Sequence, residues 1–406
     1  MPCGLQAEIG PIRTHDVLVI DETSRQVSSC RVTHTVEGLR QLQAFLLSIC
    51  GPARKEEMAC IIETTHGLLI AARLPAGFPV YPVNPKTVDR HRRASGAKTD
   101  QIDAYLLAKH GRAEWADLRR LEPDSSIVAE LKALTRDQES LIQSQTRLVN
   151  QLTACLKAYY PVALTLFSKL HQRSTWLFLQ TYPPPEVAMA ASAQQITLVL
   201  KKAKHPQAEQ VAAKIYHKLH QPHLRADAIT TRTKARLMQV LIKQLLPLLE
   251  EIATYDEEIE RLFLMHEDHE VFSSLPRAGK RLAPRLLAEI GDDRTRYAKT
   301  ASLQALAGTS PVPYESGNYS KPHRRYACSK PLRNALQQFA RPRTQTEAWA
   351  QDYYRRKRQE GKSHSEAVRA LANLWVRIIF AMWNKKEKYQ TRTFEEAQRL
   401  HAKRTA

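Results

Sequence analysis

The sequence has few cysteines, and none of them form a close pair. Its 406 residues contain six cysteines, without any Cys-X-X-Cys motif. That motif is typical of zinc sites, and dense cysteine usage is typical of secreted disulfide-rich domains. The scattered cysteines therefore argue against structural zinc and favour a reducing compartment, so we expect a cytoplasmic protein.

Long apolar runs are also missing. The sequence has no uninterrupted apolar stretch of about 18 residues, the length that a membrane-spanning helix needs. The opening residues MPCGLQAEIGPIR lack the basic start and apolar block of a secretory signal. These absences argue against a membrane protein and against an exported one.

Acidic residues are scarce relative to basic ones. The chain has 61 Lys and Arg against 41 Asp and Glu, which gives a formal net charge of +20. Such an excess suits a partner with a phosphate backbone, because the cations neutralise phosphates and release counterions. Hydrophobic residues make up 43% of the chain, so most of it should fold, into two or three domains.

The N-terminal third has the pattern of an α/β domain, in which apolar strand-like runs alternate with helical periodicity. The strands are expected at 15–21, 58–65 and 78–85, and the helices at 36–49, 67–74 and 103–112. Strands that alternate with helices predict a sheet with parallel members.

A long helical region is expected next, at residues 123–265. Apolar residues recur every seven positions between Ile127 and Cys155, although Gln138 interrupts the seam. Between Met238 and Leu262 they alternate three and four apart, which is a coiled-coil spacing, and Pro247 should kink that helix. The two helices could form an antiparallel arm within one chain or a dimerising arm, and an exposed seam would be costly, which favours dimerisation.

The C-terminal third combines turns, loops and basic helices. Residues 274–292 predict a turn followed by an amphipathic helix, 306–333 are rich in loop residues, and the part from 346 is helical, basic and aromatic. LPRAGKRLA resembles a helix-hairpin-helix turn, in which glycine allows backbone N–H groups to approach a phosphate. Lys280 and Arg281 would add positive charge there, although many such turns are only helix connectors.

Two aspartates three positions apart, in KTDQIDAYLLA, suggest a metal site. Asp100 and Asp103 would lie one helical turn apart with their carboxylates on the same side, and a divalent cation would relieve their repulsion. Glu63 is a natural third ligand, because it follows a buried strand where α/β sites form, and phosphoryl transfer often uses two metal ions. The alternative is that Asp100 caps the helix and Asp103 stabilises its first turn, with Glu63 a solvated strand end.

The order of these motifs resembles that of a known family. IIETTHGLL, FPVYPVNPKTV and KTDQIDAYLLA resemble the N-terminal domain of DEDD-type insertion-sequence transposases, and LPRAGKRLAPRLLAEIGD, LQALAGTSPVPYESG and RRYACSKPLRNAL resemble their second conserved domain. The resemblance implies an α/β RNase H-like (RuvC-type) domain at 1–122, a helical coiled-coil dimerisation arm at 123–267, a mainly α C-terminal domain at 268–390 and a basic tail at 391–406.

The resemblance also implies a Mg²⁺ site built from Asp, Glu, Asp and Asp. The last three map onto Glu63, Asp100 and Asp103. For the first, counting back along the family pattern lands on Ile9, which is not an acid, and Glu8 is one residue away.

Glu8 is an imperfect substitute, since a shift of one residue in a strand normally turns a side chain to the other face. Asp16 and Asp21 belong to the following strand and are poorer candidates. Either Glu8 serves as the first ligand, or the metal site is incomplete and the protein is an inactive remnant that only binds nucleic acid.

The family carries its catalytic serine in a Ser-Gly element, which here maps onto Ser316. The implied chemistry is attack of the Ser316 hydroxyl on a DNA phosphodiester, which gives a phosphoserine intermediate. Taken alone, this Ser-Gly pair is an ordinary turn, and a serine is a weak nucleophile without activation. A metal-dependent junction nuclease without covalent serine chemistry is therefore an alternative.

Basic and aromatic residues supply the expected nucleic-acid contacts, with arginines and lysines on phosphates and tyrosines stacking on unpaired bases. The candidates are Arg92, Arg93, Lys98, Lys280, Arg281, Arg324, Arg325, Lys330, Arg333, Tyr353, Tyr354, Arg355 and Arg356. Solvated basic faces are the alternative, and we expect Trp375, Phe380 and Trp383 to pack in a core. The resemblance further implies a structured guide RNA that pairs with donor and target DNA, a dimer or tetramer, and a bacterial, nucleoid-associated protein.

Overall fold

The computed structural model describes residues 2–7, 14–63, 77–83, 99–118, 120–317, 319–320, 322–392 and 396. The chain divides into two compact units, Met1–Ser125 with Ala305–Ser329, and Ser126–Gln304 with Lys330–Ala406. The helix expected at 67–74 and the candidate residues Glu8, Arg92, Arg93 and Lys98 lie outside the described residues.

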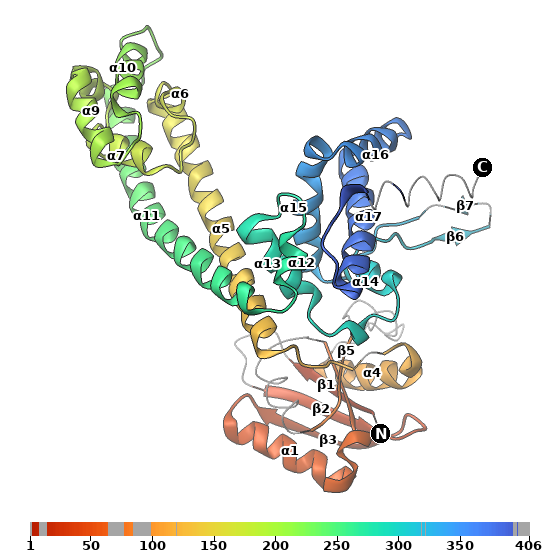
Figure 1. Cartoon of the computed structure of the whole chain (residues 1–406). Coiled ribbons are helices and arrows are strands. Elements are labelled where there is room, and N and C mark those ends of the chain that lie inside the picture. Colours follow the sequence, from red (N-terminus) through yellow and green to blue (C-terminus); the bar gives the residue numbers. More distant parts are fainter. Residues whose placement is uncertain are drawn as a thin grey trace. The chain divides into compact units, whose positions relative to one another are not determined.

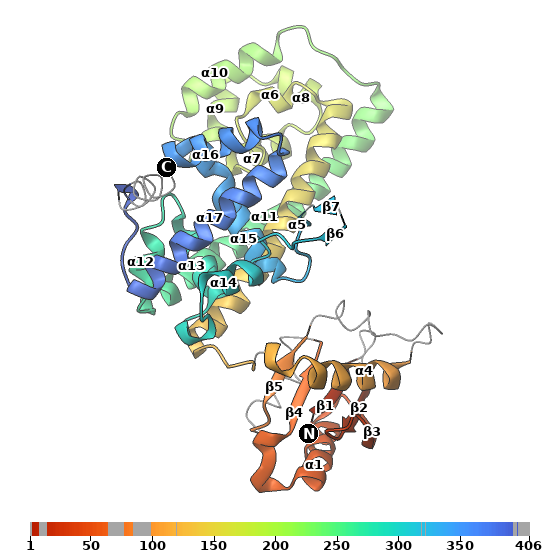
Figure 2. The same cartoon turned by 90° about the vertical axis from the view of Figure 1, so that its right-hand side faces the viewer.

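The first unit contains a five-stranded mixed sheet (Figures 1 and 2). Its strands are β1 (Pro2–Ala7), β2 (Thr14–Ile20), β3 (Gln26–Thr33), β4 (Ala59–Ile62) and β5 (Val80–Pro82), in the order β3-β2-β1-β4-β5. β2 lies between β3 and β1 and is antiparallel to both, whereas β1, β4 and β5 run parallel. The expectation of a sheet with parallel members is confirmed.

Alternate residues of each strand lie on opposite faces of the sheet, because successive side chains of a strand point to opposite sides. The helices that cover the faces are α1 (Val36–Cys50) and α4 (Asp100–Ala113). Leu42 of α1 shares a buried cluster with Val17 of β2, whereas Leu18 of β2 packs with Ala104 of α4. The even-numbered positions of β2 therefore lie on the face that α4 covers.

The same alternation extends to β4. Ile61 packs with Leu107 of α4, whereas Ile62 belongs to the cluster beneath α1. Helix α4 approaches β4 closely at Gly111, where an added Cβ would lie 2.4 Å from Ile61 Cγ1. A larger residue at Gly111 would push α4, and with it Asp100 and Asp103, away from the sheet.

The second unit begins with two long helices that lie side by side, α5 (Ser126–Tyr159) and α11 (Ala228–Met265) (Figure 1). Short helices join them at their far end: α6 (Ala163–Leu166), α7 (Arg173–Thr181), α8 (Pro185–Ala190), α9 (Ala193–Lys202) and α10 (Ala208–Leu219). Leu152 and Met238 belong to one buried cluster that extends through this end. The predicted helical region is confirmed, its two long helices pack within one chain, and α11 continues through Pro247.

The polar residue in the α5 seam has a partner on α11. Gln138 is buried, and its Nε2 donates to Asp256 Oδ1 at 2.8 Å. Arg136 of α5 makes two hydrogen bonds to the buried Glu289 carboxylate, at 2.7 and 2.9 Å. These contacts explain how a polar interruption is tolerated, since buried polar groups are stable when they are hydrogen-bonded.

The remaining helices form a compact bundle. They are α12 (His269–Ser273), α13 (Gly279–Ile290), α14 (Thr300–Leu306), α15 (Lys330–Thr346), α16 (Ala348–Gln359) and α17 (His364–Lys385). Trp375 and Trp383 are fully buried, as predicted, whereas Phe380 is half-buried. Within the described ranges, no helix has the length and apolar character needed to cross a membrane.

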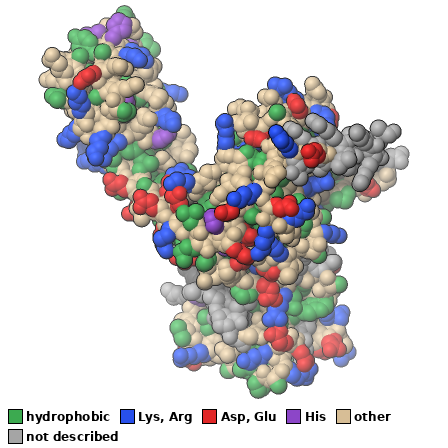
Figure 3. All heavy atoms as spheres, in the orientation of Figure 1, with side chains coloured by type: hydrophobic (Ala, Val, Ile, Leu, Met, Phe, Trp, Pro, Cys, Tyr) green, Lys and Arg blue, Asp and Glu red, His purple; other side chains and the backbone are tan. Residues whose placement is uncertain are grey.

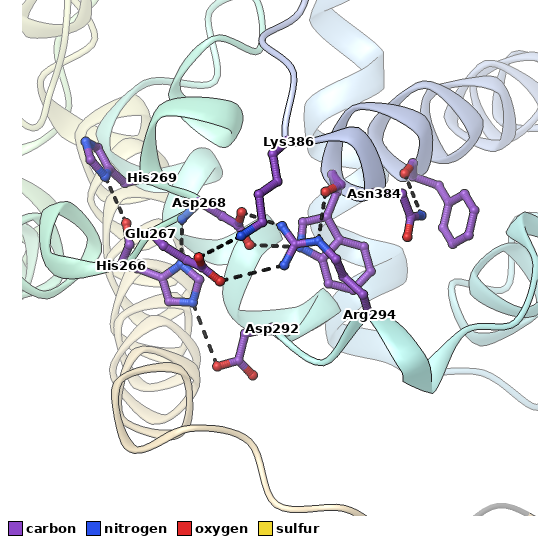
Figure 4. Close-up of polar contacts among 10 residues, drawn as sticks. His266, Glu267, Asp268, His269, Asp292, Arg294, Asn384 and Lys386 are labelled. Atoms are coloured by element: carbon purple, nitrogen blue, oxygen red, sulfur yellow. Dashed lines mark hydrogen bonds and ion pairs between the residues drawn. The ribbon is translucent and has the colours of Figure 1, made fainter.

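A buried carboxylate ties the start of this bundle to its last helix (Figure 4). Asp268 is 1% exposed and accepts hydrogen bonds from Arg294 Nη2 at 2.5 Å and from Trp383 Nε1 at 3.0 Å. Arg294 Nε also donates to the Trp383 carbonyl at 2.9 Å. Glu267 and Lys386 form an exposed ion pair of 2.8 Å beside this network.

Candidate active site

The two aspartates of the candidate site occupy the first turn of α4. Thr99 is the N-cap, because its side chain accepts from the Ile102 N–H, so the alternative in which Asp100 caps the helix is wrong. Acids in a first turn are favoured by the partial positive charge of the helix N-terminus. Asp103 is 4% exposed, whereas Asp100 is half-buried, so one carboxylate faces the interior of the unit.

Glu63 directly follows β4 and is half-buried. It is two residues beyond Ile61, which packs against α4, so the alternation of the strand places Glu63 on the face that α4 covers. The three candidate acids Glu63, Asp100 and Asp103 therefore belong to one face of the sheet and the helix that covers it.

The donor chemistry of this face suits a hard divalent cation, because all three acids offer carboxylate oxygens. Within the described residues, no three His, Cys, Asp or Glu side chains are grouped closely enough to hold an ion. Glu8, the expected first ligand, lies outside those residues. The three acids have the right ligand chemistry for a divalent ion and belong to the same face of the sheet. That they come together as a complete set of ligands stays a prediction.

The candidate nucleophile lies in a small hairpin. Ser316 ends β6 (Glu315–Ser316), which pairs antiparallel with β7 (Tyr319–Ser320), and the Ser316 side chain is exposed. Gly317 follows with φ +56°, in the left-handed region that favours glycine. The Ser-Gly pair therefore turns the chain sharply and leaves the serine open to a large substrate.

Comparisons with known proteins decide the family. Residues 12–161 match the family model for IS110-type DEDD transposases, and residues 269–355 match the model described as transposase IS116/IS110/IS902 family. A protein of the IS117 mini-circle of Streptomyces coelicolor is 30% identical over 377 residues, which cover 90% of each chain. The chain belongs to the IS110 family of transposases.

Further relatives cover similar shares of the chain. A 42 kDa protein of insertion element IS900 from Mycobacterium paratuberculosis is 29% identical over 91% of this chain and 92% of its own length. A 44.8 kDa protein of insertion element IS116 from Streptomyces clavuligerus is 29% identical over 84% of this chain and 86% of its own. The protein is thus an insertion-sequence transposase, a DNA recombinase with an RNase H-like DEDD domain.

Several basic residues expected to bind nucleic acid in this IS110-family transposase are paired with acids of the same unit. Lys280 Nζ lies 2.7 Å from Glu260 Oε2, and Arg281 makes two hydrogen bonds to Asp256, at 2.7 and 2.6 Å. In Figure 3, Lys and Arg side chains of the helical unit are interspersed with Asp and Glu rather than gathered in one patch. A phosphate at the turn before α13 would compete with Glu260 and Asp256 for these cations.

The cations that follow the candidate serine in the sequence have other surroundings. Lys330 is exposed at the start of α15, and Arg324 is exposed with its guanidinium 5.6 Å from the centre of the Tyr326 ring. Arg325 and Arg333 are half-buried. Of this group, Arg324 and Lys330 are the most accessible to a DNA backbone.

Helix α16 carries the aromatic and basic cluster of the transposase. Arg356 and Lys357 lie 5.3 and 5.7 Å from the centre of the Tyr353 ring, and the Tyr354 hydroxyl is 2.9 Å from His364 Nδ1. Arg355 and Arg356 are exposed, whereas both tyrosines are half-buried. The exposed arginines can contact phosphates, and a base could stack on Tyr353 only by displacing its own cations.

Two side-chain interactions of β2 were missed from the sequence. Asp16 is buried and makes two hydrogen bonds to Arg31, at 3.0 and 2.8 Å. His15 Nε2, on β2, lies 2.6 Å from His34 Nδ1, one residue beyond the end of β3. These interactions were hard to predict from the sequence, because Arg31 lies in β3 and His34 just after it. The residues of β3 are mostly exposed and lack an apolar pattern.

The histidine pair predicts a pH dependence of stability. Burial, and after it the neighbouring His34, lowers the pKa of His15 below its ordinary value of 6.5. The unfolded chain then binds more protons than the folded one below pH 6.5, so the free energy of unfolding should fall as the pH drops from 6.5 towards the lowered pKa. The slope is at most about 1.4 kcal/mol per pH unit.

Urea unfolding between pH 7.5 and 5 measures this dependence. His15→Asn cannot titrate at this position, so it should remove most of the loss, whereas His205→Asn, in the other unit, should retain it. Equal pH dependence in the wild type and in His15→Asn would show that other groups cause it.

Proposed function

We propose that this transposase cuts and rejoins DNA through a phosphoserine intermediate formed by Ser316. The observation that carries the proposal is the exposed Ser316 at a glycine turn, in a chain whose family resemblance assigns the nucleophile to this element. Residues 305–329 also belong to the same compact unit as the acidic α4 face. An exposed nucleophile suits a DNA duplex, which could not enter a closed pocket.

The proposed reaction conserves phosphate ester bonds. Ser316 Oγ attacks phosphorus, one P–O bond forms to serine, and the bond to one DNA strand breaks. The proton leaves Oγ, and a proton is added to the departing DNA oxygen. In the second half, a DNA hydroxyl attacks the phosphoserine, loses its proton, and Ser316 leaves with a proton. No external energy source is needed, because each step exchanges one ester for another.

The acids of the α4 face are proposed to support this chemistry. Glu63, Asp100 and Asp103 would hold a divalent ion, which we propose to be Mg²⁺ and which supplies Lewis-acid stabilisation of the phosphate charge. Family DEDD domains usually use divalent metal ions. The positive charge of such an ion would also favour the loss of the proton from the serine hydroxyl, which is a weak nucleophile without activation.

The partners beyond DNA are proposed from charge and family. A net charge of +20 exceeds what a small-molecule enzyme needs and suits a structured guide RNA in addition to DNA. We further propose a homo-oligomer, a dimer or tetramer joined by the arm at 123–267, between a catalytic domain at 1–122 and a C-terminal domain at 268–390. The location that follows is the bacterial nucleoid.

A metal-dependent junction nuclease is the second candidate. It would use the same acids without Ser316, and it is favoured by the burial of Asp103, which suits a metal ligand more than a surface acid. The two candidates share the α4 face and differ in whether protein becomes bonded to DNA.

A plasmid recombination assay with the element's flanking DNA tests the shared part of both proposals. Asp103→Asn should reduce strand cleavage at least about 100-fold, because it removes a ligand charge. Glu251→Gln, on an exposed part of α11, should behave as wild type. Full activity of Asp103→Asn in excess Mg²⁺ would remove this face from the reaction.

A further inference from the structure

The strand register identifies the position on β1 that lies nearest to the acids. Gln6 of β1 pairs with Asp16 of β2, and Leu5 of β1 pairs with Ile62 of β4. Since β1 and β4 are parallel, the residues that follow Leu5 and Ile62 are Gln6 and Glu63, which are level with each other. Position 6 therefore lies between Asp16 and Glu63 in one row across the sheet.

This row belongs to the face that α4 covers. Asp16 is two residues from Leu18, which packs against Ala104 of α4, and Glu63 is two residues from Ile61, which packs against Leu107. Residues that are directly opposite on neighbouring strands share a face of the sheet. The register thus assigns position 6 to the same face as Glu63, Asp100 and Asp103.

The nearest acid in the row is already engaged. Both Asp16 carboxylate oxygens accept hydrogen bonds from Arg31, at 3.0 and 2.8 Å, so its negative charge is neutralised within the sheet. Asp16 also lies on β2, one strand further from Glu63 than position 6 is. The match to the DEDD family model begins at residue 12, so the assignment of position 6 depends on the sheet register alone.

We propose that position 6, rather than Glu8, is the β1 position of the metal site, and that this chain has a neutral glutamine there in place of a carboxylate. The proposal rests on the proposed function, which gives the α4 face its metal. An amide oxygen can bind a hard cation but adds no charge. The site then has three carboxylates rather than four, which weakens its attraction for a divalent ion.

Restoring a carboxylate at position 6 should tighten metal binding. Gln6→Glu has the length and shape of the natural side chain and adds one negative charge. We expect it to bind Mn²⁺ and Mg²⁺ at least tenfold more tightly, which corresponds to about 1.4 kcal/mol. Gln6→Asp, a shorter acid, should act in the same direction and provides a second test if one variant folds poorly.

The test is a titration of the full chain with Mn²⁺ by electron paramagnetic resonance and with Mg²⁺ by calorimetry, after circular dichroism has shown that each variant is folded. Gln26→Glu, on exposed β3, adds the same charge elsewhere in the unit and is the matched control. The proposal is supported if metal affinity increases only in Gln6→Glu or Gln6→Asp, and if the increase is lost when Asp103→Asn is added.

Four outcomes would overturn it: no gain at position 6, an equal gain with Gln26→Glu, a gain that survives Asp103→Asn, or weaker metal binding in Glu8→Gln. The last would assign the first ligand to Glu8 instead. The titration measures metal binding without DNA, so it is independent of the recombination assay. If only the assignment of position 6 is wrong, the titration shows no gain but the protein still recombines DNA in a metal-dependent way. If the proposed function is wrong, the recombination assay shows no such activity, whatever the titration shows.

Discussion

Replacing Ser316 with alanine should abolish covalent attachment of the protein to DNA and lower strand rejoining by about 10⁴-fold or more, the scale of losing a catalytic nucleophile. The substitution removes the only protein oxygen that the proposed mechanism uses to form a bond with phosphorus. Because Ser316 is exposed in a short hairpin, its loss should leave the fold and DNA binding unchanged.

The measurement uses end-labelled DNA and a denaturing gel, on which a protein–DNA adduct migrates slowly and disappears after protease digestion. Ser320→Ala removes a hydroxyl from the opposite strand of the same hairpin and should retain the adduct. If Ser316→Ala still cleaves DNA at the wild-type rate, water is the nucleophile and the junction nuclease is the better description.

The second large effect is expected on stability, at Asp268. Asp268→Ala would remove the carboxylate that accepts from the Arg294 guanidinium and from the buried Trp383 N–H, and would leave Arg294 with the more distant Glu267 carboxylate, at 3.8 Å. Removing one partner of a buried ion pair costs about 3–5 kcal/mol, since the other charge stays in a poorly solvated place. We expect a loss of this size in the free energy of unfolding, measured by urea denaturation and circular dichroism at 222 nm, which follows the helices.

Two variants serve as comparisons for this measurement. Asp268→Asn has nearly the same shape without the charge and should lose about 1–3 kcal/mol. Glu267→Ala removes an exposed ion pair with Lys386 at 2.8 Å and a longer ion pair with Arg294 at 3.8 Å, and it should change stability by less than about 1 kcal/mol. If Asp268→Ala were as mild as Glu267→Ala, the network in Figure 4 would contribute little.

The elements that the sequence predicted best are those with strong apolar patterns. β2 and β4 were expected because each is a buried apolar run, and β5 because it lies in the strand-like stretch at 78–85. The long helices α5 and α11 were expected because their periodicity extends over many turns. β3 was missed because it is an edge strand with mostly exposed residues. The local apolar pattern therefore predicts the elements that pack in a core, but it does not predict exposed strands that pair only through the backbone.

The site was predicted less completely, for a different reason. Asp100 and Asp103 could be placed in a first helical turn from their spacing, but the cap at Thr99 is a choice between adjacent polar residues that differ little in preference. The residue opposite Glu63 depends on the register between β1 and β4, which are separated by more than 50 residues. The pairing of Arg281 with Asp256 likewise joins distant segments.

The bond between Asp268 and Trp383 spans 115 residues, and it has a consequence for how the protein is made. The helical bundle cannot be completed during synthesis until α17 has left the ribosome, so Asp268 can pair with Arg294 early but lacks Trp383 until then. A copy of the element with a premature stop codon before α17 would produce a chain that cannot close this bundle.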